Sequence, residues 1–383
     1  MRIAHVVPTY PPYRGGVGRL AEEYATRLRA RGRDVQVLTP RYQQHQGDSS
    51  FVQRLSSPLR IGNAALTPSL VSRLRGFDLV HLHYPFFGGA EPVLVRAWLG
   101  RDQPLVVSYH MDAVANGIKG AIFRWHARLV LPHIVHRADR VLVSSHDYAS
   151  QSALASIPGC LAGVEEHPYG VDTERFRPGA EPMLRKRLSI TPDLFTMIFV
   201  GGLDPAHHFK GLGVLLEALA GMRSHLWRLL VVGDGSLRPG FESKARTLGI
   251  HGRVVFIGDV SDEALPSHYR AAHLHVCPST AAAEAFSLVS LEASASGIPT
   301  VASALPGVRT VVVDGETGVH VAPGDPSGLR HALQSLMDQP DRRVQYGHDA
   351  RARVEARFRW EPAVDRLEST YGDVLRSRSV RRG

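Results

Sequence analysis

Residues 195–235, FTMIFVGGLDPAHHFKGLGVLLEALAGMRSHLWRLLVVGDG, decide the fold. Two short apolar runs, at 195–202 and 227–235, flank a segment with the periodicity of a helix at 211–222. Strands without polar alternation are buried on both faces, which is typical of a parallel sheet covered by helices. This stretch therefore predicts a strand–helix–strand unit of a doubly wound α/β domain.

The same alternation continues in both directions along the chain. Further apolar runs fall at 3–7, 34–39, 79–84, 104–110, 140–145, 253–260, 274–279 and 300–303, and further helical patterns at 17–31, 239–248 and 287–296. Two such series in succession predict an α/β protein with two doubly wound, Rossmann-like domains that face each other across a cleft. In such a protein the ligand is expected to bind in that cleft.

The polar, turn-rich segment at 170–179, GVDTERFRPG, has no periodicity and is expected to join the two domains. We therefore place an N-terminal domain at 1–174 and a C-terminal domain at 175–358. The last segment, 359–383, is helical and Arg-rich and has no strand after it. It is expected to cross back to the N-terminal domain.

The bulk composition limits the class of protein. A chain of 383 residues is too long for one ordinary core, and 44% hydrophobic with 21% charged residues is typical of a folded globular protein. Cys160 and Cys277 provide neither a disulfide framework nor a metal cluster, so a cytoplasmic location is expected. The first residues are expected to form a strand rather than a signal peptide, and no apolar run is long enough to span a membrane.

The formal net charge of +9 comes largely from arginine, which is concentrated at 27–33 and 376–382. This excess indicates either an anionic partner, such as a phosphate-bearing substrate or a membrane surface, or an ordinary solvated surface. No motif interleaves aromatic with basic residues, so nucleic acid is not expected as a partner.

Candidate binding residues follow the predicted strands, because open parallel sheets bind ligands at the carboxyl ends of their strands. Gly15 and Gly16 follow the first strand, and Gly233 and Gly235 follow the strand of the opening stretch. Such turns let a phosphate approach backbone N–H groups, although a plain tight turn explains them equally well. No acid ends the second strand, which argues against NAD. His110 ends another apolar run, where it either bonds a substrate hydroxyl or serves as a structural histidine.

Lys210 precedes Gly211 at a predicted helix start. There the ammonium, the glycine backbone and the helix dipole can together receive a diphosphate. The alternative is a solvated lysine in an ordinary loop. His207 and His208 are adjacent in sequence and do not converge on a metal as a pair four residues apart would, so no metal site is expected.

Residues 284–299, EAFSLVSLEASASGIP, contain two glutamates, Glu284 and Glu292. Ser287 is expected to cap a helix that Gly297 ends. Eight positions of a helix span about 12 Å, which suits two hydroxyl groups of one elongated ligand. Glu292 lies among small residues and is expected to be partly buried, where it can accept hydrogen bonds from a vicinal diol. The alternative is a Glu292 that faces water or pairs with an arginine.

Taken in order, these residues resemble the family 4 retaining glycosyltransferases of GT-B fold. The resemblance spans most of the chain and rests on several motifs in the family's order. They are Gly15-Gly16, Gly170-Val171-Asp172, Lys210-Gly211, Pro278-Ser279, the pair Glu284 and Glu292, the DGETG of 314–318 and the APGD of 322–325. One motif would be weak, whereas the ordered set is specific.

The resemblance implies roles by matching position. The catalytic residues would be His110, near the sugar and the acceptor, Lys210, which would neutralise the departing diphosphate, and Glu284, which would contact the donor sugar. Glu292 would hold the ribose hydroxyls of the donor. The other donor-binding residues would be Gly15, Gly16, Gly202, His208, Gly233, Gly235, Phe286, Ser287 and Leu288. Members of the family need no metal and no cofactor besides the nucleotide-sugar co-substrate, and the chain has no Asp-x-Asp motif.

The sequence departs from the family pattern at two positions. At Gly202 the family carries an arginine that pairs with the lysine on the diphosphate, so another group must supply this contact. The candidates are Arg14, His207 and His208. The usual glycine after Phe286 is Ser287, whose hydroxyl is expected to be tolerated and can donate to a phosphate.

The expected function is transfer of a hexosyl group from a nucleotide-diphosphate sugar, such as a UDP- or GDP-sugar, to an acceptor hydroxyl. The resemblance implies retention at the anomeric carbon by a front-face route, and a role in cell-envelope polysaccharide or glycolipid synthesis. Three alternatives stay open: glycosylation of a small secondary metabolite, a GT-B nucleotide-sugar epimerase, and a sugar-nucleotide-binding protein without catalysis.

The acceptor is expected to contact the N-terminal domain. Segments 81–92 and 123–140 offer aromatic, histidine and arginine side chains. The helix predicted at 123–140 either lies on an anionic membrane, where it would reach a lipid-linked acceptor, or packs as an ordinary helix. The expected location is therefore the cytoplasm, with peripheral contact to the inner face of the cytoplasmic membrane as the second option.

Overall fold

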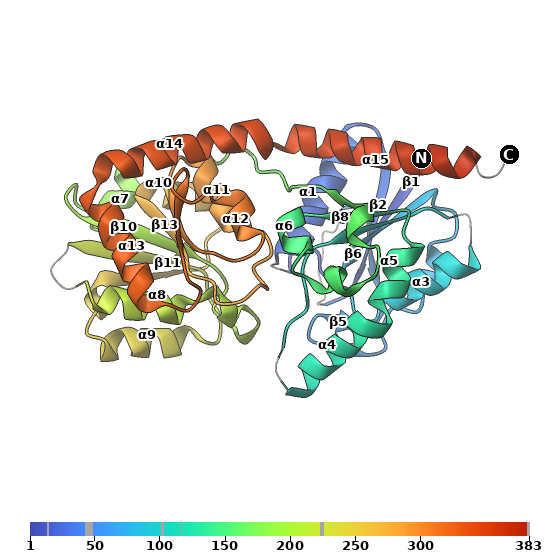
Figure 1. The fold of residues 1–383 in the computed structure, drawn as a ribbon, viewed down its shortest axis with the longest axis horizontal. Coiled ribbons are helices and arrows are strands. Elements are labelled where there is room, and N and C mark those ends of the chain that lie inside the picture. Colours follow the sequence, from blue (N-terminus) through green and yellow to red (C-terminus); the bar gives the residue numbers. More distant parts are fainter. Residues whose placement is uncertain (14, 43–48, 101–102, 116, 223–225, 381–383) are drawn as a thin grey trace. The chain divides into compact units, whose positions relative to one another are not determined.

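The chain divides into two compact units. Unit 1 comprises Met1–Tyr169 and Glu361–Gly383, and unit 2 comprises Gly170–Trp360 (Figure 1). The computed structural model describes residues 1–13, 15–42, 49–100, 103–115, 117–222 and 226–380. Arg14, Arg381 and Arg382, which the sequence suggests as candidate cations, lie outside the described residues.

Unit 1 contains a seven-stranded parallel sheet in the order β3-β2-β1-β6-β7-β8-β9. Its strands are β1 (Arg2–Val6), β2 (Asp34–Pro40), β3 (Val52–Leu55), β6 (Leu79–Tyr84), β7 (Leu105–Tyr109), β8 (Arg140–Val143) and β9 (Val164–Glu166), and a separate hairpin pairs β4 (Arg60–Ile61) with β5 (Ala64–Ala65). β1 lies beside β6, so the order of the strands reverses between them. This is the point at which a doubly wound sheet opens a crevice.

The helices of unit 1 connect these strands. They are α1 (Gly16–Ala30), α2 (Leu70–Arg73), α3 (Ala90–Leu99), α4 (Gly117–Leu129), α5 (Leu131–Arg137), α6 (His146–Ala149), the short η1 (Ala153–Ser156) and η2 (Leu161–Gly163), and α15 (Trp360–Val380), which returns to this unit from Glu361 onward. α15 buries Val364, Leu367, Tyr371 and Val374, which share one face of the helix.

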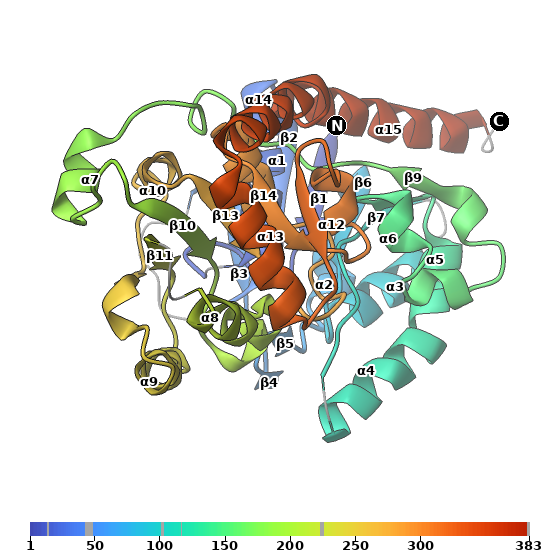
Figure 2. The same cartoon turned by 60° about the vertical axis from the view of Figure 1, so that its left-hand side comes forward.

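Unit 2 contains a six-stranded parallel sheet in the order β12-β11-β10-β13-β14-β15. The strands are β10 (Phe195–Val200), β11 (Trp227–Val232), β12 (Val254–Gly258), β13 (Leu274–Cys277), β14 (Thr300–Ser303) and β15 (Gly318–Val321). The helices are α7 (Pro182–Arg187), η3 (Pro205–Lys210), α8 (Leu212–Ala220), α9 (Arg238–Thr247), η4 (His251–Arg253), α10 (Leu265–Ala271), α11 (Leu288–Ala295), α12 (Val308–Val311), α13 (Pro326–Asp338) and α14 (Pro340–Arg357). The predicted α/β class with two doubly wound sheets is confirmed (Figures 1 and 2).

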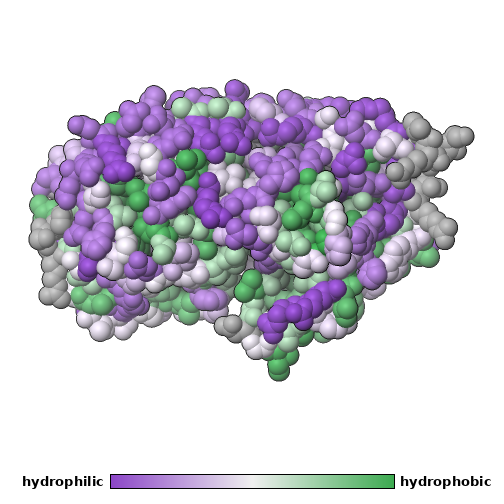
Figure 3. All heavy atoms as spheres, in the orientation of Figure 1, coloured by the Kyte–Doolittle hydropathy of each residue, from purple (hydrophilic) through white to green (hydrophobic). Residues whose placement is uncertain are grey.

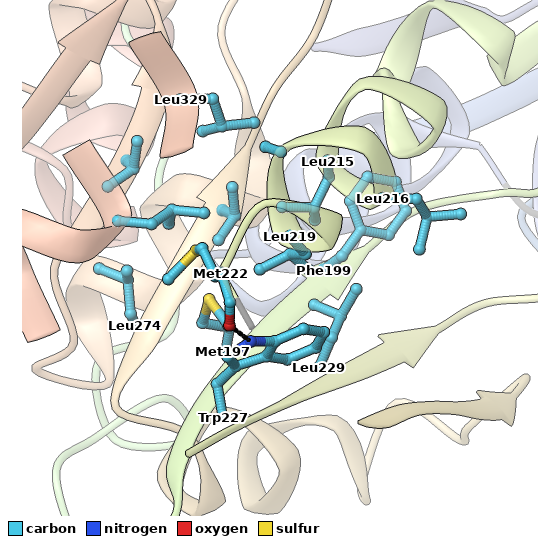
Figure 4. Packing of buried hydrophobic residues seen from close by; sticks show 14 of the residues in the cluster. Met197, Phe199, Leu215, Leu216, Leu219, Met222, Trp227, Leu229, Leu274 and Leu329 are labelled. Carbon is cyan, nitrogen blue, oxygen red and sulfur yellow. Dashed lines mark hydrogen bonds between the residues drawn. The ribbon is translucent and has the colours of Figure 1, made fainter. Parts of the chain in front are cut away.

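The core of unit 2 shows why the opening stretch folds as predicted. Alternate residues of β10 and β11 point to one face of the sheet, where α8, α9 and α13 cover them. Met197 and Leu229 meet side chains of α8 there, and Trp227 at the start of β11 is 2% exposed (Figure 4). The indole Nε1 of Trp227 donates to the carbonyl oxygen of Met222 at 2.8 Å, so its one polar atom is satisfied inside the core (Figure 4).

The arginine runs are largely used inside unit 1. Arg31 and Arg33 both donate to Glu368 on α15, at 2.8 and 2.6 Å. Arg378, on the same helix, donates to Asp139 at 2.7 Å. The sequence offered two interpretations of these arginines: a surface for an anionic partner, or an ordinary solvated surface. The ion pairs within unit 1 support neither. They fasten α15 to the sheet-bearing part of the unit.

The single helix expected at 123–140 is two helices, α4 and α5, separated by Val130. Pro132 lies in the first turn of α5, where its missing N–H is not needed, but it could not have continued α4 without losing a hydrogen bond. The expectation of one continuous helix was therefore wrong. None of the helices in the described ranges combines the length and the apolar character that a bilayer crossing requires.

Candidate functional site

The strand order of unit 2 reverses between β10 and β13, which are neighbours in the sheet. Ligands of doubly wound sheets bind where loops leave the carboxyl ends of such a strand pair. η3 follows β10 and ends at Lys210, and the segment after β13 leads through Glu284 into α11. The topology therefore brings the predicted lysine and the first predicted glutamate to one edge of the sheet.

Lys210 and Glu284 form a buried ion pair. The ammonium Nζ lies 2.6 Å from the carboxylate Oε2, and the two side chains are 16% and 6% exposed. Ser279 donates to the same carboxylate oxygen at 3.0 Å. The interpretation of Lys210 as a solvated lysine is wrong.

Gly211 makes this pairing sterically feasible. Its φ is +76°, in the left-handed region, and a Cβ at this position would lie 1.9 Å from the carbonyl oxygen of Pro278. Only glycine lets the two loops come so close. The backbone N–H of Thr280 donates to the carbonyl oxygen of Phe209 at 2.7 Å and joins the same loops. The Lys-Gly pair of the sequence is thus a cation followed by the residue that positions it.

The charge of Lys210 is set by opposing effects. Burial by itself lowers the pKa of this ammonium, but Glu284, Cys277 and Glu292 raise it, and the net pKa lies above the ordinary value of a lysine. The side chain is therefore a cation at neutral pH in a nearly dry environment, where its field is weakly screened. Glu292 belongs to the same electrostatic cluster.

Glu292 lies on α11 and is 7% exposed, so the expected burial is confirmed and a Glu292 that faces water is excluded. Tyr269, which is fully buried on α10, donates its hydroxyl to Oε2 of Glu292 at 3.0 Å. The hydroxyl fixes one oxygen of the carboxylate. Tyr269 was not predicted, because it lies 23 residues from Glu292 in the sequence and no motif surrounds it.

Ser287 does not cap α11 as expected. It occupies the N-cap position with φ +64°, a left-handed conformation that is uncommon for a serine, and its side chain makes no cap bond. Its hydroxyl lies 2.8 Å from Oγ of Ser290 and 3.3 Å from Sγ of Cys277. In the left-handed backbone the side chain points into the interior at the end of β13. A contact of this hydroxyl with a phosphate would require these bonds to open.

The residues on either side of Ser287 differ in burial. Phe286 is 3% exposed and its ring makes an edge contact with Phe358, so its side chain belongs to the core. Leu288 begins α11 and is half-buried. The first N–H groups of a helix have no partner within it, and the helix dipole is positive there. The backbone of this turn, rather than the Phe286 side chain, can face an anion.

Gly202 lies directly against His207. A Cβ on Gly202 would be 2.8 Å from Nδ1 of His207, and that nitrogen lies 2.8 Å from Oδ2 of Asp204. The imidazole therefore occupies the space in which a side chain at 202 would begin. His208 is exposed, with Nδ1 2.9 Å from the carbonyl oxygen of Pro205. Of the described candidates for the replacement cation, His207 is the one in contact with Gly202.

Gly233 and Gly235 pack on the backbone that follows β10. A Cβ on Gly233 would lie 2.1 Å from the carbonyl oxygen of Gly201, and one on Gly235 would lie 2.3 Å from the carbonyl of Leu203. This close approach is a structural reason for both glycines. It also brings the turn after β11 next to Gly202.

The remaining predicted residues belong to unit 1. Gly15 is the N-cap of α1 and Gly16 its first residue, at the carboxyl end of β1. Gly15 has extended backbone, and a Cβ there would make only ordinary contacts with Thr9 and Tyr13, whereas a Cβ on Gly18 would lie 2.7 Å from the carbonyl oxygen of Thr9. Gly18 is therefore the glycine of this loop that packing requires.

His110 follows β7 as predicted, but both of its ring nitrogens have partners within the protein. Nδ1 lies 2.7 Å from the hydroxyl of Tyr169, and Nε2 lies 2.9 Å from Nδ1 of His83. Burial lowers the pKa of His110 to about 3, so the ring is neutral. A bond from this ring to a substrate would require one of the two existing bonds to open.

The structure thus brings Lys210, Glu284 and Glu292 together in unit 2, with Gly202, His207, Gly233 and Gly235 in the adjoining loops, whereas Gly15, Gly16 and His110 lie in unit 1. Nε2 of His110 contacts His83, which in turn contacts His5. His5 was missed, and His81 and His83 were expected only as part of the acceptor-contacting segment 81–92. A signal was present in the sequence, because the alternation in LVHLHY at 79–84 directs both of its histidines to the same face of one strand.

Comparison with known proteins gives concordant matches. Residues 181–353 match the family model described as Glycosyl transferases group 1, and residues 14–175 match the one described as Glycosyltransferase Family 4. D-inositol 3-phosphate glycosyltransferase 2 of Catenulispora acidiphila is 33% identical over 315 residues, which cover 77% of this chain and 70% of that protein. D-rhamnosyltransferase WbpZ of Pseudomonas aeruginosa is 27% identical over 369 residues, which cover 94% and 92%. Sucrose-phosphate synthase of Thermosynechococcus elongatus has the same fold, with a TM-score of 0.81 at 24% identity over 98% of this chain and 99% of that chain.

Proposed function

Because the chain belongs to the family 4 glycosyltransferases of GT-B fold, we propose that it transfers a hexosyl group from a nucleotide-diphosphate sugar to an acceptor hydroxyl with retention at the anomeric carbon. The observation that carries the proposal is the buried Lys210–Glu284 pair, 2.6 Å apart at the carboxyl edge of the unit 2 sheet. A largely buried ammonium whose pKa is raised, at the start of α8, supports a role in receiving a diphosphate leaving group.

Donor binding then uses the two carboxylates separately. Glu292, held by Tyr269, accepts hydrogen bonds from the ribose hydroxyls, which compensate for its burial. Glu284, held by Ser279, accepts a hydrogen bond from a hydroxyl of the donor sugar. The first-turn N–H groups of α11 and the ammonium of Lys210 lie toward the diphosphate. His207, beside Gly202, supplies the second cationic contact when it is protonated.

Catalysis in this proposal is mainly electrostatic. The bond between the anomeric carbon and the diphosphate oxygen breaks, and the acceptor oxygen bonds to the same face of that carbon. The acceptor proton passes to the departing diphosphate, so no protein carboxylate has to act as a nucleophile. Lys210 stabilises the negative charge that grows on the leaving group, which is the effect that fixed charges in a dry site provide best.

We propose a lipid-linked glycan or glycolipid of the cell envelope as the acceptor, because unit 1 presents an apolar stripe on α4. Ile118, Ile122, Trp125 and Leu129 are 82%, 54%, 60% and 52% exposed and recur at intervals of four, three and four residues. This spacing puts them on one side of the helix. Lys119, Arg124 and Arg128 accompany them, and α4 contains no acidic residue. Apolar and hydrophilic surfaces lie side by side at the lower edge of unit 1, where α4 is found (Figures 1 and 3).

A second acceptor class has independent support. The relative from Catenulispora acidiphila is named for D-inositol 3-phosphate, a small phosphorylated cyclitol, and is 33% identical to this chain. A small acceptor of this kind would need no contact with a membrane. It therefore remains the alternative against which a lipid-linked acceptor is tested.

The test is a donor and acceptor screen with the intact protein. UDP-, GDP- and ADP-hexoses are first ranked by the shift in melting temperature, and the best donor is then offered with lipid-linked glycans or with inositol phosphates. We expect release of nucleoside diphosphate only with an acceptor present, and a product with the donor's anomeric configuration by NMR. Interconversion of the sugar without acceptor would indicate an epimerase. Tight donor binding without turnover with any acceptor would indicate a non-catalytic binding protein.

A further inference from the structure

Four buried histidines of unit 1 form one continuous hydrogen-bonded chain with two tyrosines and a serine. The links are Tyr169 Oη to His110 Nδ1 (2.7 Å), His110 Nε2 to His83 Nδ1 (2.9 Å), His83 Nε2 to His5 Nδ1 (3.1 Å), His5 Nε2 to Tyr371 Oη (3.1 Å), Tyr371 Oη to His81 Nδ1 (2.6 Å) and His81 Nε2 to Ser108 Oγ (2.7 Å). None of the seven residues is more than 8% exposed. We call this set the histidine chain.

The sheet brings these residues together. His5 on β1 pairs directly with His81 on β6, and His83 lies two residues further along β6 on the same face. His83 in turn pairs with Ser108 on β7. Tyr371 reaches the cluster from α15. The histidine chain therefore runs across three neighbouring strands and connects the last helix of unit 1 to the carboxyl end of β7.

All four rings are neutral. Burial lowers the pKa of His5 and of His110 to about 3, and burial together with neighbouring histidines lowers the pKa of His81 and His83 well below its ordinary value. In the described part of the protein, no partner of these ring nitrogens is a carboxylate that could compensate a positive ring. A neutral histidine has one N–H donor and one acceptor nitrogen.

This leads to a constraint on where the protons lie. Each of the seven groups carries one proton, and each of the six links needs one. If every link is made and Tyr371 also donates within the chain, all groups donate in the same direction, so all four histidines share one tautomer. They carry the proton on Nε2 when Tyr169 donates to His110, and on Nδ1 when the direction is opposite. The arrangement in which the two directions collide leaves the hydroxyl of Tyr371, which is fully buried, without an acceptor.

We propose that the histidine chain is proton-ordered as a single unit, so that Tyr371 on α15 sets the tautomer of His110 three links away. Tyr371, His5 and His83 are then positioning residues for His110. The order reverses when one proton enters at one end, each group passes its proton to the next acceptor, and one proton leaves at the other end. No group gains or loses a net charge in this exchange.

A metal site is the competing explanation of the cluster. His5, His81 and His83 each offer a nitrogen, and these atoms lie within 4.8 Å of one another. However, the rings of His81 and His83 are stacked, with centroids 4.5 Å apart and planes inclined by 24°. The lone pair of an imidazole lies in the plane of its ring, so stacked rings direct their lone pairs side by side rather than at one ion. The hydrogen-bonded chain accounts for all the ring nitrogens without this conflict.

Two tyrosine variants test the proposal because they should favour opposite directions of hydrogen-bond donation along the histidine chain. Tyr371→Phe removes the partner of His5 Nε2, and a buried N–H without an acceptor is more costly than an unpaired lone pair. His5 then carries its proton on Nδ1, and His83 and His110 follow. Tyr169→Phe removes the partner of His110 Nδ1 instead. His110, His83 and His5 then all carry the proton on Nε2.

The readout is the ¹⁵N spectrum of intact protein labelled at histidine, which distinguishes protonated from unprotonated ring nitrogens. We expect the four rings of the wild type to be neutral between pH 5 and 8 and to share one tautomer. Three rings should differ in tautomer between Tyr371→Phe and Tyr169→Phe. Tyr24→Phe is the matched control, since its hydroxyl contacts His167, 3.0 Å away, outside the histidine chain. It should leave these three rings unchanged.

Three results would overturn the proposal: mixed tautomers within the wild-type chain, the same tautomers in the two variants, or a stoichiometric metal in the purified protein. The wild-type spectrum tests the proposal even where a variant fails to fold. None of these readouts depends on glycosyl transfer, so the failure of the proposed function would leave the result intact.

Discussion

At the scale of single residues, the buried pair of Lys210 and Glu284 has two separable consequences. We expect Lys210→Met to lower the rate of transfer by about 10²-fold or more, because it removes fixed charge at the leaving group. It should also lower the free energy of unfolding by about 3 kcal/mol, because it leaves Glu284 buried without its partner. Steady-state kinetics and denaturant unfolding measure the two effects.

The double variant Lys210→Met with Glu284→Gln separates them. Removing both charges should restore most of the stability, because no unpaired buried charge remains. It should restore none of the activity, because the ammonium at the leaving group is still missing. Lys210→Arg is the charge-conserving control for the single variant. Wild-type activity in Lys210→Met would contradict the role assigned to this ammonium.

Ser287 offers a test of backbone strain. A serine with φ +64° is strained by about 1 kcal/mol, and its hydroxyl bonds to Ser290 and Cys277 offset part of that. We expect Ser287→Ala to lower the free energy of unfolding by about 1–2 kcal/mol, because alanine keeps the strain and loses the bonds. Ser287→Gly loses the same bonds but relieves the strain, so it should be the more stable of the two. Denaturant unfolding that ranks alanine above glycine would refute this account.

The sequence could be used to predict which residues carry charge at this edge of the sheet, but not their partners. Lys210, Glu284 and Glu292 stand out because lysine and glutamate are conspicuous next to glycine turns and small apolar residues. Tyr269 and Tyr169 do not stand out, because they meet Glu292 and His110 only after folding, across 23 and 59 residues. The left-handed backbone of Ser287 could not be predicted either, because a serine before a helix usually indicates a helix cap.

At the scale of elements, the attachment of α15 depends on pH. Burial by itself raises the pKa of Glu368, but hydrogen bonds from Arg33 and Arg31 outweigh this effect and hold the pKa below its ordinary value. The stabilisation is therefore complete above the pKa of an unfolded glutamate, about 4.3, and is lost as the pH falls through the lower folded value. We expect Glu368→Gln to lower the free energy of unfolding at pH 7 by no more than about 1 kcal/mol, since the arginines are partly solvated.

The same variant supplies the check on the mechanism. The difference in melting temperature between the wild type and Glu368→Gln should begin to shrink as the pH falls below about 4.3. It should vanish below the lower folded pKa of Glu368, where both side chains are neutral. A difference that stays constant down to acid unfolding would show that Glu368 acts through packing and not through its charge.

The apolar stripe of α4 is the second element with a measurable consequence. We expect the protein to sediment with anionic vesicles at low salt and to be released at high salt, because the lysine and arginines of α4 face lipid headgroups. Ile122→Glu and Trp125→Glu should each weaken this binding by more than about tenfold, since each puts a carboxylate into the apolar face. Val344→Glu is the matched control, because Val344 is 69% exposed on α14 of unit 2. Equal loss of binding in all three variants would contradict a specific role of α4.

Elements with regular periodicity could be predicted from the sequence, and irregular ones could not. The apolar strands β1, β6, β7, β10 and β11 fall where the pattern indicates them. Short strands such as β3 to β5 have no continuous apolar run, and so escaped prediction. The break between α4 and α5 at Val130 follows from Pro132, a signal that was present but outweighed by the apolar spacing around it.

At the scale of the whole molecule, the two units differ in how the chain builds them. Unit 2 is one continuous segment, Gly170–Trp360, whereas unit 1 needs both Met1–Tyr169 and the segment from Glu361 onward. We expect residues 170–360 expressed alone to unfold cooperatively and to bind the proposed nucleotide sugar without transferring the sugar. Residues 1–169 alone should be unstable, because the face that buries Val364, Leu367, Tyr371 and Val374 would be exposed to water.

Circular dichroism melts and calorimetric titration of the two fragments measure these outcomes. Adding a synthetic peptide of residues 361–380 should raise the stability of the 1–169 fragment. A 1–169 fragment that melts like the intact protein would show that α15 contributes little to unit 1.

The overall architecture could be predicted because it depends on periodicity, which the long strands and helices of both units show. Two series of buried strands specify two doubly wound sheets. The domain boundary was expected between residues 174 and 175. The chain passes from unit 1 to unit 2 five residues earlier, between Tyr169 and Gly170. The acceptor and the stereochemistry of transfer could not be derived in the same way, because they depend on contacts with ligands that no periodicity encodes.

The discontinuity of unit 1 also sets an order of events at the ribosome. α15 is translated only after all of unit 2, and the roughly 190 intervening residues take on the order of 10–40 s at about 5–20 residues per second. Throughout that interval the apolar face of unit 1 that α15 covers is exposed to water, and the histidine chain lacks Tyr371. Unit 2 can fold during this interval. α15 then packs onto a sheet that was synthesised before unit 2. Until it does, the exposed apolar face of unit 1 is a binding site for chaperones that recognise nascent chains.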